Sequence, residues 1–192
     1  MIYKVGLNTR DLDRLADFLD NYADTFNEKV TLFLNKLADK AIEVGSANGG
    51  DFSRFIFYSK KLEDGTTIYV SATSKLIRTE WFPGSKSHET RSEVISPLLM
   101  AEFGSGHYAI SDENAPGLGG QGTLNKYGHA FDDEGWYWYA DMPPKGDATA
   151  VKTTASGKVK YHSKGNRPTR PLHKAVMACV QQVNEIAKEV FG

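Results

Sequence analysis

Histidine and acidic side chains near the middle of this 192-residue chain are the first candidates for chemistry. His107, His129 and the acidic run 132–134 can supply metal ligands, or the acid and base of a small hydrolase. No two of them have the tight spacing of a zinc site, and the run lacks the pattern of a Ca²⁺-binding loop. We therefore expect polar loop side chains and no metal site here, and a hydrolase remains an alternative function.

A glycine-rich stretch, 117–122, matches the letters of the dinucleotide-binding fingerprint G-x-G-x-x-G. That fingerprint binds a pyrophosphate only between a strand and the N-terminus of a helix. The residues on either side, 111–116 and 123–128, predict neither element. The sequence also contains no G-x-S-x-G elbow and no phosphate-binding G-x-x-x-x-G-K-[ST] loop. We therefore expect no cofactor.

Cys179 is the only cysteine of the chain, so an intrachain disulfide is impossible and a reducing compartment is the simpler assumption. It falls on the apolar face of a predicted helix, where a thiol is usually buried and inert. The sequence thus predicts no catalytic, cofactor-binding or metal-binding residues, and we expect a protein without enzymatic activity.

The composition is that of an ordinary soluble domain, with 40% hydrophobic and 24% charged residues. No apolar run approaches the roughly eighteen residues that a transmembrane helix needs. The N-terminus becomes polar too early for a signal peptide. We expect one domain over 1–192, and its expected parts are a helical N-terminal part (1–48), a β-hairpin and short helix (49–103), a mobile loop (104–135), strands and a basic loop (136–170) and a C-terminal helix (171–191).

The hydrophobic periodicity predicts an α+β fold. N-terminal helices and a long C-terminal helix pack on a small antiparallel β-sheet, and the loops are long and rich in glycine. Apolar residues recur at intervals of three and four over 9–22 and 24–44, which predicts two helices, or one that continues after a bend. We interpret this stripe as core. The C-terminal helix begins near Pro171, with Thr169 near its cap, and is expected to pack on 24–44.

The expected strands are rich in β-branched and aromatic residues. Stretches 52–58 and 67–73 predict a hairpin, since Asp64-Gly65 between them is a strong turn signal. Ile77, Trp81 and Phe82 can continue this sheet before a loop at 83–88. Further strands are expected at 136–139 and about 159–162, separated by a loop over 143–156.

The stretch from Ser96 to Gly106 is expected to anchor the structure. Ser96 is a good helix cap and Pro97 suits the first helical position. The glycines tolerate the left-handed conformation that ends a helix. We expect Glu102 to hold a local hydrogen bond and Phe103 to be buried with the face of Trp136. The predicted structural anchor comprises Glu102, Phe103, Gly104, Gly106, Trp136 and Trp138.

Charge is distributed unevenly along the second half of the chain. Residues 100–144 contain seven acidic and one basic residue, whereas 145–174 contain eight basic and one acidic. Two such blocks suit a protein that meets copies of itself, or they neutralise each other within one subunit. The candidate interface residues are Tyr108, Tyr127, Tyr137, Tyr139, Lys158 and Lys160.

Several motifs in the same order resemble the tail-completion, or minor tail, component family of long-tailed bacteriophages and prophages. They are Ser-Pro-Leu-Leu-Met-Ala-Glu-Phe-Gly-Ser-Gly (96–106), Gly-His-Ala-Phe-Asp (128–132), Gly-Trp-Tyr-Trp-Tyr (135–139), His162-Ser163 and Pro-Thr-Arg-Pro (168–171). The resemblance covers roughly residues 92–190. This chain departs from the family pattern at Arg170-Pro-Leu-His173, where the family commonly has Met-Pro-Met-Tyr, and its loop after Trp138 is longer and more basic.

The resemblance implies an α+β fold, no catalysis and assembly as a ring at the junction of phage head and tail. Its partners would be other tail and head–tail connector proteins, with no recognition of nucleic acid sequence and no membrane. The protein would reside in the neck or tail of the virion, and in the host cytoplasm during assembly. A carbohydrate-binding module that uses Trp136 and Trp138 is a further alternative.

Overall fold

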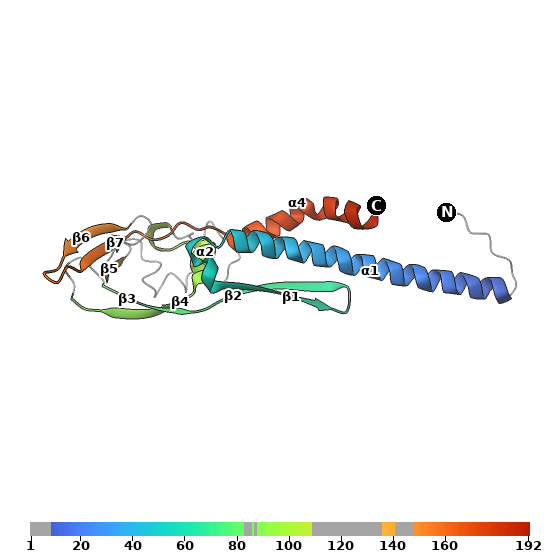
Figure 1. Ribbon diagram of the computed structural model, residues 1–192, viewed down its shortest axis with the longest axis horizontal. Coiled ribbons are helices and arrows are strands. Elements are labelled where there is room, and N and C mark those ends of the chain that lie inside the picture. The colour runs from blue at the N-terminus through green and yellow to red at the C-terminus, as the bar shows by residue number, and fades with distance from the viewer. Residues whose placement is uncertain (1–8, 83–85, 87, 109–135, 141–147) are drawn as a thin grey trace.

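The computed structural model describes residues 9–82, 86, 88–108, 136–140 and 148–192. The chain forms an elongated body with two different ends (Figure 1). One end contains the two long helices and a β-hairpin, the other contains the remaining strands, and a short helix lies between them. The predicted α+β class is confirmed.

The N-terminal helical region is one helix, α1 (Thr9–Ala47). The prediction of two helices, or of a bend near residue 23, is therefore wrong. Ala23 and Asp24 interrupt the apolar stripe without breaking the backbone, because neither is a glycine or a proline. The helix ends before Asn48-Gly49-Gly50, and Gly50 has a positive φ of 58°.

The C-terminal helix α4 (Pro171–Phe191) packs along the second half of α1, as predicted. The Phe191 ring lies 6.0 Å from Phe26 and 5.7 Å from Phe33, so α4 ends beside Phe26. Cys179 Sγ donates to the Leu37 carbonyl at 3.4 Å. The first half of α1 extends beyond the end of α4 (Figure 1).

The predicted hairpin is present as β1 (Ile56–Glu63) and β2 (Thr67–Ser74). Asp64 and Gly65 have φ of 53° and 66°, and this pair of positive values matches the right-handed twist of the strands. The hairpin begins later than expected, because Gly50–Phe55 form the short 3₁₀ helix η1. The turn contacts α1 where Thr31 Oγ1 donates to the Gly65 carbonyl at 3.3 Å.

The strands beyond the hairpin form two further antiparallel sheets. β3 (Ile77–Trp81) pairs with β4 (Arg91–Ile95), so the prediction that Ile77 to Phe82 continue the hairpin sheet is wrong. β5 (Trp136–Ala140), β7 (Val159–Ser163) and β6 (Thr149–Thr153) form a sheet in the order β5-β7-β6. β6 lies inside the loop predicted at 143–156. Its exposed residues show no alternation in burial, which explains why the pattern missed it.

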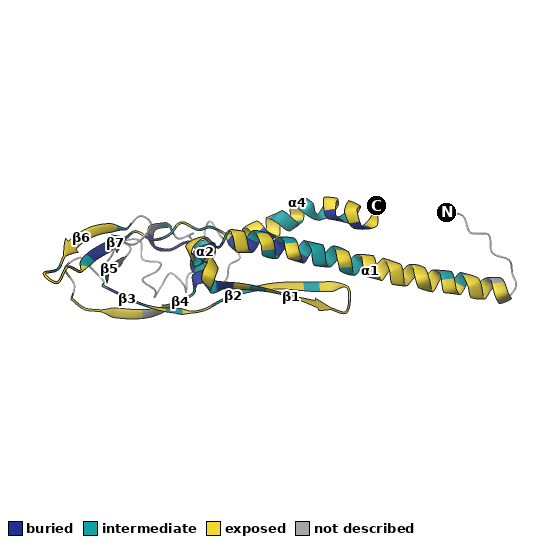
Figure 2. Cartoon of the chain, in the orientation of Figure 1, coloured by how far each residue is buried: buried dark blue, intermediate teal, exposed yellow. Residues whose placement is uncertain are grey.

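Burial is concentrated in the middle of the molecule, around the short helix α2 (Pro97–Phe103) and the facing parts of α1 and α4 (Figure 2). By contrast, the first half of α1 is almost entirely exposed. Among the described residues, no helix is apolar enough over a sufficient length to span a membrane.

Candidate assembly site

The predicted anchor begins with α2, which has the local structure that its sequence indicates. Ser96 Oγ accepts a hydrogen bond from Leu99 N at 3.5 Å, and Pro97 occupies the first turn. The helix ends at Gly104, whose φ of 77° suits glycine. Its N–H donates to the Met100 carbonyl at 2.9 Å.

Glu102 connects α2 to the start of α4. Its carboxylate oxygens accept hydrogen bonds from Leu172 N at 2.8 Å and His173 N at 3.1 Å. The side chain is buried, with 8% exposure. A helix N-terminus presents free N–H groups and a partial positive charge, so a buried carboxylate stabilises it by both effects. The hydrogen bonding expected of Glu102 is present, but its partners lie some 70 residues away.

Thr169 lies directly before the cap position of α4, near the cap as predicted, but its side chain does not cap the helix and donates to the Ala101 carbonyl at 3.3 Å. The residue at the cap position is Arg170, in the left-handed conformation, and its side chain makes no capping hydrogen bond. Thr169 N and Arg170 N instead donate to the Ala101 carbonyl at 2.8 and 3.0 Å. The end of α2 thus holds the segment that leads into α4, and Glu102 supplies the cap that the local sequence lacks.

The two glycines of the motif allow the chain to approach segment 163–166 closely. Ser105 is fully buried; its N–H donates to the Asn166 carbonyl, and its Oγ accepts from Asn166 N, both at 2.9 Å. A Cβ on Gly106 would lie 2.2 Å from the Lys164 carbonyl oxygen. A Cβ on Gly165 would lie 1.9 Å from the Ser105 carbonyl oxygen. We call residues 101–106 together with 163–173 the junction.

The junction includes the first residues of the loop that was predicted to be mobile from 104 to 135. Residues 104–106 are buried, and Gly106–Tyr108 form the 3₁₀ turn η2, so the first residues of that range belong to the packed structure. Tyr108 is half-buried and lies under the Arg167 guanidinium, 4.7 Å from the ring centroid. The rest of the predicted loop, 109–135, lies outside the described residues, as does Tyr127.

Phe103 is half-buried. The Trp136 side chain is outside the described part of the structure, so the predicted contact between these two rings stays a prediction. Trp138 is half-buried and lies 6.0 Å from the Tyr161 ring across β5 and β7.

Lys160 is buried, with 1% exposure, and this contradicts its prediction as an interface residue. Its ammonium lies over the rings of Phe82, Tyr137 and Tyr139, at 4.7, 5.6 and 5.5 Å from their centroids. Cation–π attraction stabilises such a charge. Burial, and to a smaller extent the positive charge of Lys152 on the neighbouring strand, lowers the pKa of Lys160. Lys160 therefore belongs to the packing of the sheet.

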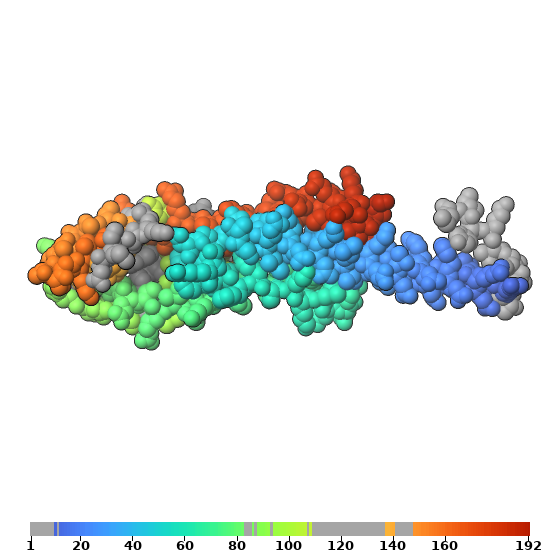
Figure 3. Space-filling view, viewed as in Figure 1, coloured from blue at the N-terminus to red at the C-terminus, as the bar shows by residue number. Residues whose placement is uncertain are grey.

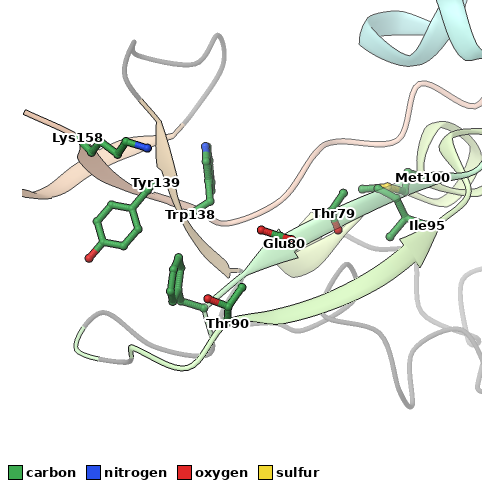
Figure 4. Close-up of a pocket in the computed structure, with 9 residues that line it drawn as sticks. Thr79, Glu80, Thr90, Ile95, Met100, Trp138, Tyr139 and Lys158 are labelled. Atoms are coloured by element: carbon green, nitrogen blue, oxygen red, sulfur yellow. The ribbon is translucent and has the colours of Figure 1, made fainter.

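Tyr137 and Tyr139 are half-buried and already have aromatic partners. Tyr137 stacks on His162 at 4.4 Å, and Tyr139 meets Phe82 edge to face at 5.1 Å. Lys158 is exposed at the rim of a cavity of about 480 Å³ between β3 and β5. Figure 4 shows Trp138 and Tyr139 on one side of this cavity and Thr79 and Glu80 on the other. Of the predicted interface residues whose side chains the structure describes, Lys158 is the one that is exposed.

A second concave surface lies at the helical end, and sequence reasoning did not find it. It is an apolar groove of about 500 Å³. Leu37 and Ala41 of α1, Ile68 and Val70 of β2, and Val176 and Val180 of α4 line it. Val176 and Val180 are each 62% exposed. We call this surface the groove.

Tyr58 of β1 also lines the groove, beside α1. Its hydroxyl is buried and has no hydrogen-bond partner among the described residues. Burial raises the pKa of this hydroxyl, and the nearby charge of Glu102 raises it further. A Cβ on Gly45 would lie 2.7 Å from the ring, so the glycine in α1 makes room for it.

Further apolar side chains are exposed on the first half of α1. Leu12, Leu19, Tyr22 and Phe26 are between 49% and 62% exposed. They share one face of the helix with Leu15, and we call these five residues the stripe. The periodicity identified this face correctly, but its interpretation as core is wrong for residues 12–26. A repeat of apolar residues shows that a helix has an apolar face and carries no information about what covers it.

The other chemistry-bearing candidates give no site in the described residues. His129 and the acidic run 132–134 lie outside them, as does the side chain of His107. The part of the chain that is described contains no group of three or more His, Cys, Asp or Glu side chains able to hold a metal ion. Burial raises the pKa of the Cys179 thiol, which makes its reactive thiolate scarce at neutral pH.

No protein-family model, curated protein or solved structure matches this chain.

Proposed function

We propose that this protein is a structural component of a phage or prophage tail, which completes the tail and joins it to the head. It acts without catalysis, by assembling into an oligomeric ring that contacts neighbouring tail and connector proteins. In this proposal the protein resides in the virion neck, after assembly in the host cytoplasm. The proposal rests on the ordered motifs that resemble the tail-completion family.

One observation supports treating those motifs as a unit. Ala101 of the first motif accepts hydrogen bonds from Thr169 and Arg170 of the last motif. Glu102 and Ser105 pair with residues that flank the last motifs, namely Asn166, Leu172 and His173. Motifs separated by about 60–70 residues thus build one structural element, the junction. Chance matches to short letter patterns have no reason to meet in space in this way.

The shape and surface of the chain also suit an assembly protein. The described body is elongated, and large apolar side chains are exposed on α1, the hairpin and α4. Monomeric soluble proteins seldom expose apolar patches larger than a few hundred Å², so such surfaces usually mark contacts with other proteins.

Deletion of the gene from the phage or prophage that carries it tests this function. We expect induced cells to release filled heads and separate tails by electron microscopy, and the intact gene supplied in trans to restore joined particles. Joined, infectious particles from the deletion strain would contradict the proposal. Retention of joining by a variant that lacks the acidic run 132–134 and both His107 and His129 would argue further against the alternative hydrolase.

A further inference from the structure

We propose that the stripe on α1 of one copy docks in the groove of a second copy, so that subunits join head to tail. This inference rests on the proposed ring assembly and assigns the surfaces that build it. The contact is a helix in a groove, in which apolar side chains at intervals of three and four residues enter an apolar channel. The occupant of the groove is a second copy of this chain.

The stripe lies on a helix that leaves the body of its own subunit. The α4 helix ends beside Phe26, and the hairpin turn contacts α1 at Thr31. Asp24 still lines a pocket together with the hairpin turn, so residues 12–23 extend beyond both partners of α1, over about 18 Å of helix. Figures 1 and 3 show this half of α1 projecting from the body.

The stripe and the groove cannot meet within one molecule. Leu37 and Ala41, which line the groove, belong to the same continuous helix as the stripe. A helix without a break cannot fold back onto its own side. An occupant supplied by this chain must therefore come from another copy.

The groove offers the stripe the surroundings that α1 already has within its own subunit. From Phe26 onward, the apolar face of α1 packs against α4, and the hairpin lies beside it. The groove is lined by α4 and the hairpin, together with residues of α1 itself. Docking in a second copy would thus continue, between subunits, the packing that ends at Phe26 within one.

Charge favours the same pairing. Residues 10–28 of α1 contain six acidic residues and two basic ones. The hairpin (56–75) and the first half of α4 (171–182) together contain four basic residues and two acidic ones. Opposite net charges on the two surfaces steer their encounter, whereas two acidic α1 segments repel each other. This disfavours the alternative in which two stripes pair symmetrically.

The size of the contact fits a ring better than a stable dimer. One face of a 15-residue helix offers roughly 400 Å², so the two partners bury about 800 Å², which is below the roughly 1,200–2,000 Å² of a stable protein–protein interface. A single contact of this kind is weak. Head-to-tail contacts that close into a ring reinforce one another, because the last subunit is held at both sides.

Two single substitutions test the contact in solution. Leu19→Glu places a charge in the stripe and Val180→Glu places one in the groove, at positions that are 53% and 62% exposed, so the fold is retained. Asn21→Glu and Gln181→Glu are the matched controls, because each adds the same charge at an exposed position outside the stripe and the groove. If the thermal melt of Leu19→Glu differs from that of the unaltered chain, Leu12→Glu is used for the stripe instead. Val176→Glu takes the place of Val180→Glu in the groove in the same case.

Sedimentation velocity at up to about 1 mM protein measures the association. We expect the unaltered chain and both controls to associate, and each stripe or groove variant alone to be monomeric. An equimolar mixture of the two variants should form a dimer and nothing larger, because one intact stripe and one intact groove remain. A monomeric unaltered chain, a monomeric mixture, or association of either variant alone would overturn the proposal.

Labelling of Cys179 provides an independent readout, because it is the only cysteine and it lines the groove. In the mixture, the intact stripe of the Val180→Glu subunit occupies the intact groove of the Leu19→Glu subunit. Maleimide labelling of Cys179 in the Leu19→Glu subunit should therefore be at least several-fold slower than in a sample of Leu19→Glu alone. An unchanged rate would contradict docking in the groove.

The gene-deletion assay separates this inference from the proposed function. If the Leu19→Glu gene restores joined particles as well as the intact gene does, the inference fails while the function stands. If the deletion strain produces joined particles but the variant mixture still dimerises, the function fails while the contact stands.

Discussion

The junction is polar and hydrogen-bonded, whereas the groove is lined by apolar side chains. This difference separates the contacts that hold the subunit together from the surface that remains available to other molecules. In the junction, backbone N–H groups, carbonyls and the Glu102 carboxylate pair with one another in buried positions. In the groove, apolar side chains of three elements face an open channel, and two of its valines are more than half exposed. Burial of a polar group costs free energy unless the group is hydrogen-bonded within the chain. Exposed apolar side chains, by contrast, remain available for contact with another molecule.

The largest loss of stability is expected when one methyl group is added at the junction. Gly165→Ala should reduce the free energy of unfolding by about 4 kcal/mol, because the new Cβ clashes with the Ser105 carbonyl and the backbone φ of 117° disfavours alanine. Gly157→Ala is the control, since Gly157 also has a positive φ but has no atom within 4 Å of its Cβ position; it should cost about 1 kcal/mol. Equal losses in urea unfolding would show that close approach at the junction does not matter.

Removal of the Glu102 carboxylate should have the next largest effect. Glu102→Ala leaves the N–H groups of Leu172 and His173 without their acceptor and should cost about 3 kcal/mol in urea unfolding. Glu102→Gln keeps one acceptor oxygen and should lose about half as much. If the alanine and glutamine variants are equally stable, the carboxylate does not cap α4.

The buried Lys160 predicts a dependence of stability on pH. Its pKa in the folded protein lies below the ordinary value of 10.5, so between these two values the unfolded chain binds more protons. Stability from this group therefore rises with pH through that window. The difference in urea midpoint between the unaltered chain and Lys160→Met, measured at increasing pH up to 10.5, should shift in favour of the unaltered chain. A difference that does not change with pH would contradict the lowered pKa.

The smallest effect is expected beside the groove. Tyr58→Phe removes a buried hydroxyl that has no hydrogen-bond partner among the described residues, and it keeps the ring against α1. It should change the free energy of unfolding by less than about 1 kcal/mol, toward greater stability. A loss as large as that of Glu102→Ala would mean that the polar groups beside the groove are as integral to the fold as those of the junction.

The sequence was sufficient wherever local geometry decides the structure. Asp64-Gly65 specifies its turn because both residues must have positive φ, and few pairs tolerate that. Ser96, Pro97 and Gly104 determine where α2 begins and ends, because they act on adjacent backbone groups. The apolar periodicity likewise placed α4 and both halves of α1 in helices.

The tertiary structure decided what each of those elements meets. Glu102 caps a helix about 70 residues away, which no local rule can reveal. Lys160 is buried because two rings of β5 and the Phe82 ring, which follows β3, converge on it. The apolar face of α1 is one pattern along the whole helix, yet α4 covers it beyond Phe26, and it is largely exposed up to that residue. The sequence determines that a face is apolar, because side-chain chemistry and helical pitch are local properties. Which part of that face is covered depends on where α4 ends in space, and the position of that end is determined only by the tertiary packing of the chain.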